Sequence, residues 1–369
     1  MSLRYGIIGC GSMGREHILT ILALGGQVSA LFDPHEPSIS ASLALMPETL
    51  AKPKIFTKAG DLIKSGLCDA VVVATPNFTH AEILRELLPS DLHILIEKPL
   101  CTTIADCQDV LNRAAGRRAL VWVGQEYRYM PPVAELIRQA HAGEIGHLHR
   151  VSIREHREPF YPKIGDWNRF TANTGGTLVE KCCHYFNLME FILRQPATSV
   201  FATGGQRVNH LDESYQGKKP DILDSAFVIV QFANGAEAML DLCMFAENAP
   251  ENEQIIAVGD KGRLETLIPA LTLAKSMRAD WGQRQIWGKE SGTGRGVDVR
   301  RIWNSNIRYP GQHYGATFIE HQKFAEAIAR GTPPEVNLIE GMRAVAIGIA
   351  AHQSIAEKRS VDLSEILGA

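Results

Sequence analysis

The sequence predicts two domains: an α/β domain with a parallel sheet, then an α+β domain with a large, mostly antiparallel open sheet. Three observations support this. The length of 369 residues allows two hydrophobic cores. Short apolar runs alternate with helical patterns up to residue 125, as in parallel sheets. Beyond it, half-buried strands and the hairpin signal Asn234-Gly235 indicate antiparallel pairing.

The composition excludes several classes of protein. With 45% hydrophobic residues, 21% charged residues and a net charge of -3, the chain is ordinary for a globular protein. This charge predicts neither a nucleic-acid partner nor a membrane surface, and there is no apolar run of about 18 residues. The seven cysteines include no C-x-x-C pair, which favours a reduced, cytoplasmic protein. We expect no metal site.

A glycine-rich turn follows the first predicted strand and opens a helix. Gly9 would allow a tight reversal, Gly11 would let a pyrophosphate approach the backbone, and Gly14 would let the helix lie close to the strand. The free N–H groups at Ser12 and Met13 would then face the phosphates. Glycine turns also join strands to helices where nothing binds, so the next strand is needed to decide.

That strand, predicted over residues 27–32, ends in Asp33, which follows Gly14 by 19 residues. A carboxylate at about this interval reaches the ribose hydroxyls in a dinucleotide site. It also repels a 2'-phosphate, so the pattern predicts a dinucleotide site that binds NAD rather than NADP. The alternative is an aspartate that caps the turn before Pro34.

Further strands are predicted at 54–56, 70–74, 93–96 and 119–124. Ligands of open parallel sheets lie at the carboxyl ends of the strands. Four cofactor contacts are therefore expected after the strand at 70–74: Thr75, Pro76, Asn77 and His80. His80 could equally be a surface residue of the following helix.

The strand at 93–96 leads into Glu97-Lys98-Pro99. Pro99 favours an extended conformation for Lys98 and removes a backbone donor. The Lys98 ammonium could then reach a hydroxyl or carbonyl beside the nicotinamide, with Glu97 in the same cofactor site. The alternative interpretation is a surface turn.

A polar, aromatic and proline-rich stretch after residue 125 marks the predicted boundary, which gives domains 1–125 and 126–369. In the second domain strands are predicted at 148–157, 199–203, 226–232, 237–242 and 255–258, with helices at 318–330 and 338–357. The open face of this sheet favours self-association. The tryptophan-containing segment 277–311, with Trp281, Trp287 and Trp303, is a surface excursion or an interaction arm.

A single helix is predicted from 176 to 193. It would place Glu180, His184 and Asn187 on one face at i, i+4 and i+7. A carboxylate one turn from a histidine can orient the ring and set its basicity, as a general base requires. The alternative is a buried helix with a hydrogen-bonded histidine.

Taken together, the sequence resembles the glucose-fructose oxidoreductase and inositol dehydrogenase family, Gfo/Idh/MocA. The resemblance covers nearly the whole chain and rests on the glycine turn followed by His17, on 74–77 with His80, on 97–99, on the helix from Gly175 to His184, and on the C-terminal helix pair closed by 360–363. It implies a Rossmann domain, a sheet domain that binds substrate and forms oligomers, and NAD(P)-dependent oxidation of a sugar or cyclitol hydroxyl or the reverse.

The resemblance also implies catalytic roles. Lys98 would hydrogen-bond the reacting hydroxyl, and His184 would remove its proton as hydride passes to the nicotinamide. Glu180 stands where the family commonly has Asp, and Asn187 where a second Asp is common, so the substrate stays open. Further residues that could line the substrate pocket are Arg128, Trp167, Arg169, Tyr309 and His313.

We therefore expect an NAD-dependent dehydrogenase of a sugar, inositol or related polyol that uses Lys98, His184 and Glu180. A rival with the same residues is a redox-assisted glycoside hydrolase, which would return the hydride after releasing an aglycone. A rival of another class is a catalytically idle NAD-binding sensor or scaffold.

Overall fold

The computed structural model describes residues 3–278 and 297–368. Trp281 and Trp287 of the predicted surface excursion or interaction arm therefore lie outside the described residues. The chain divides into two compact units that are not contiguous in sequence. The first comprises Met1–Tyr129, Pro162–Asn187 and Ser305–Ile349, and the second comprises Met130–Tyr161, Leu188–Asn304 and Ala350–Ala369. The contiguous boundary after residue 125 stays a prediction.

The first unit contains a parallel sheet in the order β3-β2-β1-β4-β5-β6. Its strands are β1 (Arg4–Ile8), β2 (Gln27–Phe32), β3 (Lys54–Phe56), β4 (Ala70–Val73), β5 (His93–Glu97) and β6 (Val121–Gly124). The intervening helices are α1 (Ser12–Ala23), α2 (Glu36–Leu43), α3 (Ala59–Ile63), η1 (Asn77–Thr79), α4 (His80–Leu87) and α5 (Ile104–Ala114). The predicted Rossmann domain is confirmed.

Apolar residues explain why these segments form a covered sheet. Every residue of β4 is buried, as are both isoleucines that end β1. Strands buried on both faces are typical of parallel sheets with helices on each side. Since the strands are parallel, their carboxyl ends meet at one edge, and Gly9, Asp33, Thr75 and Lys98 all follow such ends.

Segments from later in the chain complete the first unit. They are η2 (Glu126–Tyr129), η3 (Ile164–Arg169), α7 (Thr171–Thr174), α8 (Thr177–Glu180), the first residues of α9 (Cys183–Leu193), α10 (Ala316–Arg330) and the first part of α11 (Leu338–Glu357). Helix α10 packs against both α1 and η2.

The single helix predicted over 176–193 is wrong, because the structure has two helices there. Helix α8 ends at Glu180 and α9 begins at Cys183, with a turn between them. Glu180 and His184 therefore lie on different helices. All residues from 177 to 189 are buried, so no amphipathic pattern marks the break.

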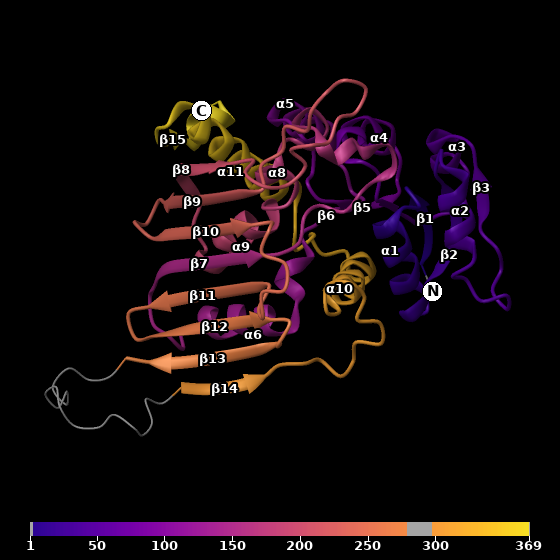
Figure 1. The fold of residues 1–369 in the computed structure, drawn as a ribbon. Coiled ribbons are helices and arrows are strands. Elements are labelled where there is room, and N and C mark those ends of the chain that lie inside the picture. Colours follow the sequence, from indigo (N-terminus) through magenta and orange to yellow (C-terminus); the bar gives the residue numbers. More distant parts are fainter. Residues whose placement is uncertain (1–2, 279–296, 369) are drawn as a thin grey trace, which may run out of the picture. The chain divides into compact units, whose positions relative to one another are not determined.

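The second unit contains a sheet in the order β14-β13-β12-β11-β7-β10-β9-β8-β15 (Figure 1). Its strands are β7 (Leu148–His156), β8 (Ala197–Gly205), β9 (Ser225–Phe232), β10 (Glu237–Cys243), β11 (Glu253–Gly259), β12 (Gly262–Ile268), β13 (Thr272–Met277), β14 (Val297–Arg301) and β15 (Val361–Asp362). Among the described pairings of this second sheet, only that of β7 with β10 is parallel. The predicted, mostly antiparallel sheet is confirmed.

One face of this sheet is covered and the other is open. Helix α6 (Pro131–His141) packs on β11, β12 and β13, and α12 (Leu363–Leu367) packs on β8. Along β9, buried residues alternate with exposed ones. The open face carries the large apolar side chains Phe201, Phe227, Ile229 and Met239, which are between 39% and 58% exposed.

Strands β12, β13 and β14 were not predicted. Strand β14 falls within the segment interpreted as a surface excursion or arm, and all five of its residues are exposed. The Asn234-Gly235 hairpin between β9 and β10 is confirmed. No helix in the described part of the chain is long and apolar enough to cross a membrane.

Candidate active site

The glycine turn has the shape that a dinucleotide phosphate requires. Gly9 has a φ of +95°, and a Cβ there would lie 2.5 Å from the Ala74 carbonyl oxygen. A Cβ on Gly14 would lie 2.0 Å from the Gly9 oxygen, so the helix must approach the turn closely. By contrast, a Cβ on Gly11 would meet nothing within 4 Å, which leaves room above the backbone. The turn fits a pyrophosphate.

Helix α1 adds an electrostatic reason for anion binding. Its N-cap residue, Gly11, provides no side-chain hydrogen bond, and there is no acidic residue in the first turn. The N–H groups at Ser12 and Met13 and the positive end of the helix dipole are thus available to a phosphate.

The Asp33 side chain accepts hydrogen bonds from backbone N–H groups at the glycine turn and just after Asp33. The Cys10 N–H donates to Asp33 Oδ2 at 2.7 Å, and the His35 N–H donates to Asp33 Oδ1 at 2.8 Å. Each carboxylate oxygen can accept a second hydrogen bond. The carboxylate is therefore fixed beside the glycine turn, and its contact with a ribose stays a prediction.

In the segment after β4, one predicted cofactor contact has an unsatisfied polar atom and another is held by hydrogen bonds, and their contact with a cofactor stays a prediction. Asn77 is 7% exposed, and its Nδ2 has no hydrogen-bond partner within the described ranges. His80 is fully buried, with Nδ1 2.8 Å from the Pro99 oxygen and Nε2 3.1 Å from the Thr75 oxygen. His80 thus joins two loops at the carboxyl edge of the sheet from beneath.

Glu97 belongs to a buried hydrogen-bonded chain. Its Oε1 lies 2.9 Å from His17 Nε2, and His17 Nδ1 lies 2.8 Å from His321 Nε2. The Lys98 N–H donates to Glu97 Oε2 at 3.2 Å. Burial opposes ionisation of Glu97, but the hydrogen bond from His17 and the charges of His17 and Lys98 hold its pKa below the ordinary value.

Lys98 reaches from the end of β5 to the helix break. Its Nζ donates to the backbone oxygen of Glu180 at 3.1 Å. This is a carbonyl at the point where α8 stops, four residues before His184, so the ammonium group stabilises the interrupted helix. Burial lowers the pKa of Lys98, but the nearby groups Cys183, Glu97 and Glu126 more than offset this and raise it.

His184 is buried and lies against an aromatic ring. Its ring stacks on that of Tyr127, with centroids 3.9 Å apart and an angle of 2° between the planes. Lys181 Nζ donates to the Tyr127 hydroxyl at 2.6 Å. Burial, reinforced by the positive charges of Lys98 and Lys181, lowers the pKa of His184 well below its ordinary value. The ring is therefore neutral at pH 7 and can accept a proton.

The carboxyl group beside His184 is Glu126, which was not predicted as a site residue. Its Oε1 lies 3.7 Å from His184 Nε2 and 3.3 Å from His313 Nδ1. Burial raises the pKa of Glu126 to about 8, and the charge of Glu97 adds to this. Tyr127 was also missed, because no local pattern in 126–129 distinguishes it from a domain boundary. Lys181 was missed because it lies in the turn between α8 and α9, which was predicted as part of one helix.

The predicted substrate residues are not all together. Arg128 is buried, and it donates to Asn187 Oδ1 at 2.5 Å and to Glu340 Oε2 at 2.6 Å. The Tyr309 hydroxyl donates to Glu16 on α1 at 3.1 Å. The structure thus places Arg128 in an ion pair and Tyr309 near the glycine turn, while His313 lies beside Glu126.

Trp167 and Arg169 both lie in η3. The Trp167 ring meets that of Phe78 edge to face, with centroids 6.2 Å apart. Phe78 follows Asn77, so Trp167 lies close to the predicted cofactor contacts after β4. Arg169 is 2% exposed and donates to Asn168 Oδ1 at 3.3 Å.

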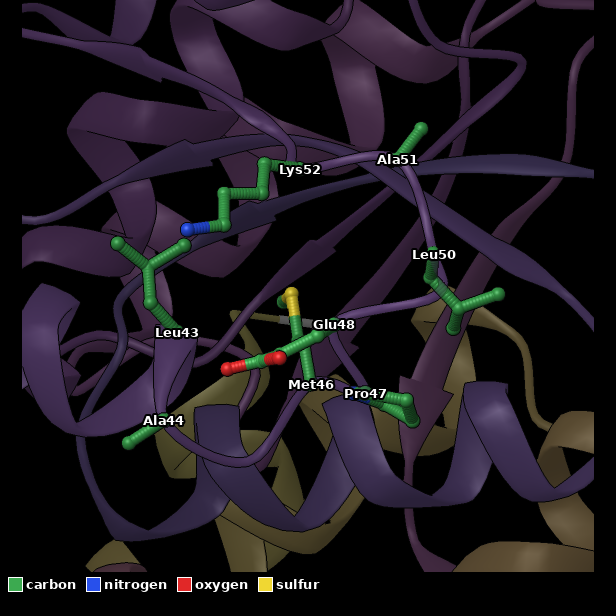
Figure 2. Close-up of a pocket in the computed structure, with 8 residues that line it drawn as sticks. All are labelled: Leu43, Ala44, Met46, Pro47, Glu48, Leu50, Ala51 and Lys52. Atoms are coloured by element: carbon green, nitrogen blue, oxygen red, sulfur yellow. The ribbon is translucent and has the colours of Figure 1, made fainter.

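A separate cavity of about 290 Å³ lies between the end of α2 and the start of β3 (Figure 2). It is lined by Leu43, Ala44, Met46, Pro47, Glu48, Leu50, Ala51 and Lys52. This position is at the amino end of β3, at the edge of the sheet opposite the glycine turn. The cavity therefore does not belong to the dinucleotide site.

Family models match both parts of the chain. Residues 3–125 match the NAD-binding Rossmann fold of an oxidoreductase family, and residues 135–363 match the C-terminal alpha/beta domain of the same Gfo/Idh/MocA family. The chain belongs to the Gfo/Idh/MocA oxidoreductases. It is therefore an oxidoreductase with an NAD-binding domain, as the resemblance implied.

Curated relatives and solved structures agree with this assignment. The chain is 26% identical to a myo-inositol 2-dehydrogenase of Thermotoga maritima, across 99% of this chain and 100% of the relative. It is 33% identical to inositol 2-dehydrogenase 1 of Saccharopolyspora erythraea, across 76% and 78% of the two chains. A levoglucosan dehydrogenase in complex with NADH and levoglucosan has the same fold, with a TM-score of 0.81, 20% identity and coverage of 98% and 99%.

Proposed function

We propose that this oxidoreductase transfers a hydride between NAD and a hydroxyl-bearing carbon of a sugar, inositol or related polyol. One observation carries the proposal: the Lys98 ammonium donates to the Glu180 carbonyl at 3.1 Å, at the helix break that leads into His184. An ammonium from β5 and a neutral imidazole from α9 are thus held in one compact unit. The inositol dehydrogenases among the relatives support the same substrate class.

We assign Lys98, His184 and Glu180 different roles in the proposed reaction. Lys98 would release the Glu180 carbonyl or share a proton with it, and donate a hydrogen bond to the reacting hydroxyl. His184 would take the hydroxyl proton, because its lowered pKa keeps it neutral until substrate arrives. When bound, the nicotinamide cofactor accepts the hydride from the same carbon. Glu180, at the end of α8, would bind a neighbouring hydroxyl.

The cofactor would lie along the carboxyl edge of the Rossmann sheet. Gly9, Gly11 and the first turn of α1 would hold the pyrophosphate, and Asp33 would accept from the ribose hydroxyls. We infer NAD rather than NADP, since the Asp33 carboxylate would repel a 2'-phosphate. The unpaired Nδ2 of Asn77 supports a polar ligand at this edge.

We further propose that the chain forms a homodimer or homotetramer through the open face of the second sheet. That face exposes Phe201, Phe227, Ile229 and Met239, and exposed apolar clusters commonly mark protein contacts. Size-exclusion chromatography with light scattering would measure the mass, and a monomer would contradict this part. A cytoplasmic location agrees with the seven cysteines, none of which forms a disulfide within the described residues.

The deciding experiment is a screen of polyols and sugars with NAD and NADP in parallel, in which formation of reduced cofactor is followed by absorbance. Turnover of a polyol with NAD is expected. An idle sensor would bind NAD without turnover on any compound. A redox-assisted glycoside hydrolase would instead release aglycone from a glycoside without net formation of NADH.

A further inference from the structure

Glu126 is a buried carboxyl group without a hydrogen bond to any other residue in the described part of the chain. Its side chain is 2% exposed, and neither Oε1 nor Oε2 has a hydrogen-bond partner there. Burying an unpaired polar group costs free energy, and native proteins satisfy nearly all such groups. An exception inside a candidate active site indicates a group that works with a ligand or a proton.

The surroundings of Glu126 are those of a proton acceptor between two imidazoles. Its Oε1 lies 3.7 Å from His184 Nε2 on α9 and 3.3 Å from His313 Nδ1, just before α10. The other charged groups that act on it include Glu97 at the end of β5, Lys98 after it, Lys181 between α8 and α9, and Glu320 on α10. Contacts of this length in a ligand-free site commonly shorten when the substrate binds.

The Tyr127 ring keeps this arrangement in place. It stacks on His184, with centroids 3.9 Å apart, and it lies 5.4 Å from the ring of His313. The two imidazoles therefore lie against one aromatic residue, whose neighbour in the sequence is Glu126. Exposure increases toward His313: its side chain is 21% exposed, against 1% for His184 and 2% for Glu126.

We propose that Glu126 and His313 form the proton exit of the reaction, so that the proton taken by His184 leaves through Glu126 to His313 and then to water. The inference rests on the proposed polyol dehydrogenase function and assigns two residues to it that act through His184. In oxidation, the hydroxyl proton passes to His184, from the imidazolium to a Glu126 carboxylate oxygen, and from that carboxyl to His313. The hydride and its electron pair leave the same carbon for NAD, so the substrate loses two hydrogens and two electrons.

The test is the pH profile of polyol oxidation in wild type and in Glu126→Gln, which keeps the shape but cannot carry the proton. In wild type, kcat should rise with pH through about 8, where the carboxyl becomes a carboxylate that can accept. In Glu126→Gln this inflection should vanish and kcat should fall by about 10- to 100-fold, less than the ~10²–10⁴-fold typical of a direct general base. NAD affinity should not change.

Two further variants keep the test specific. His313→Ala should lower kcat similarly, and added imidazole should restore part of the rate. Glu320→Gln is the matched control, since Glu320 is also a buried carboxyl with a raised pKa, but it accepts from Trp122 Nε1 at 3.1 Å. That variant should keep the inflection, at a lower pH because the charges of Glu126 and Glu320 repel each other.

The outcomes separate the two proposals. If wild type oxidises no polyol, both fail. If wild type oxidises a polyol and Glu126→Gln keeps both the kcat and the pH inflection of wild type, the proposed proton exit is wrong and the proposed function stands. Infrared titration of the cofactor-free protein gives a second readout. The difference spectrum of wild type minus Glu126→Gln removes the band of the other buried carboxyl, Glu320, and should contain a protonated-carboxyl band that disappears near pH 8. A difference spectrum without such a band would overturn the inference.

Discussion

Two buried pairs of histidine and glutamate in the first unit differ in one respect. In the pair of His17 and Glu97, the nitrogen and oxygen are 2.9 Å apart, and the second carboxylate oxygen accepts from the Lys98 N–H. In the pair of His184 and Glu126 the separation is 3.7 Å, and neither carboxyl oxygen has a hydrogen-bond partner among the residues described. The same residue types are satisfied in one place and unsatisfied in the other.

The pKa values follow this difference. Hydrogen bonding and charge overcome burial at Glu97 and lower its pKa, whereas burial dominates at Glu126 and raises its pKa to about 8. We call the hydrogen-bonded pair of His17 and Glu97 closed, and the pair of His184 and Glu126 open. A closed pair stabilises one ionisation state and one geometry, so it suits a structural role. An open pair can change its protonation at moderate pH, so it suits chemistry. Lys98 contacts both pairs. Its backbone N–H donates to Glu97 of the closed pair, and its ammonium group interacts with Glu126 of the open pair.

The largest expected effect comes from Lys98→Met. This change removes the ammonium group near Glu126 and keeps the hydrogen bond from the backbone N–H of residue 98 to Glu97. Turnover of the polyol should fall by about 10²–10⁴-fold, because the hydroxyl loses its hydrogen-bond donor. The NAD dissociation constant, measured by calorimetry, should change little. Unchanged turnover would remove Lys98 from the mechanism.

His17→Ala breaks the closed pair and leaves the Glu97 carboxylate buried without its partner. Removal of one partner from a buried pair typically costs about 3–5 kcal/mol. Denaturant unfolding should show a loss of this size, whereas Glu126→Gln should cost less than about 1 kcal/mol because it removes no hydrogen bond. Equal losses in the two variants would abolish the distinction between closed and open pairs.

The pH dependence of stability should have opposite sign at the two carboxyls. The pKa of Glu126 is raised from 4.5 to about 8, so its contribution is fully present below pH 4.5 and is lost as the pH rises to about 8. The pKa of Glu97 is lowered from 4.5, so its contribution is present above that pH and is lost as the pH falls below it. The unfolding free energy of wild type minus that of Glu126→Gln should therefore decline from pH 4.5 to 8. A constant difference would contradict the raised pKa.

Asp33→Ala gives the smallest expected effect and tests whether a satisfied carboxylate can also bind a ligand. Both Asp33 oxygens already accept from backbone N–H groups. NAD affinity should fall by about 10- to 100-fold, as expected for lost hydrogen bonds to a charged group, and the preference for NAD over NADP should weaken. A coenzyme preference that does not move would show that Asp33 only shapes the turn.

The parts of the fold that depend on local pattern were predictable. Every strand of the Rossmann sheet was predicted to within two residues, because buried parallel strands are continuous apolar runs between turn signals. The exposed, charged strand β14 was missed, since it depends on pairing with β13 rather than on an apolar pattern.

The candidate site was only partly predictable, for a similar reason. The place of Lys98 after a strand follows from the apolar run of β5. His184 was predicted on a single helix, which the structure divides into α8 and α9. The helix break after Glu180 and the burial of Glu126 depend instead on packing among segments far apart in the sequence. No periodicity in 177–189 could reveal the break, because every residue there is buried.

The most direct test of the account is the rate of hydride transfer from a polyol to NAD in a single turnover, compared between wild type and His184→Ala at saturating NAD. We expect the rate in the variant to be lower by at least about 10²-fold, with NAD bound equally well. A rate within about twofold of wild type would contradict the assignment of His184 as the base.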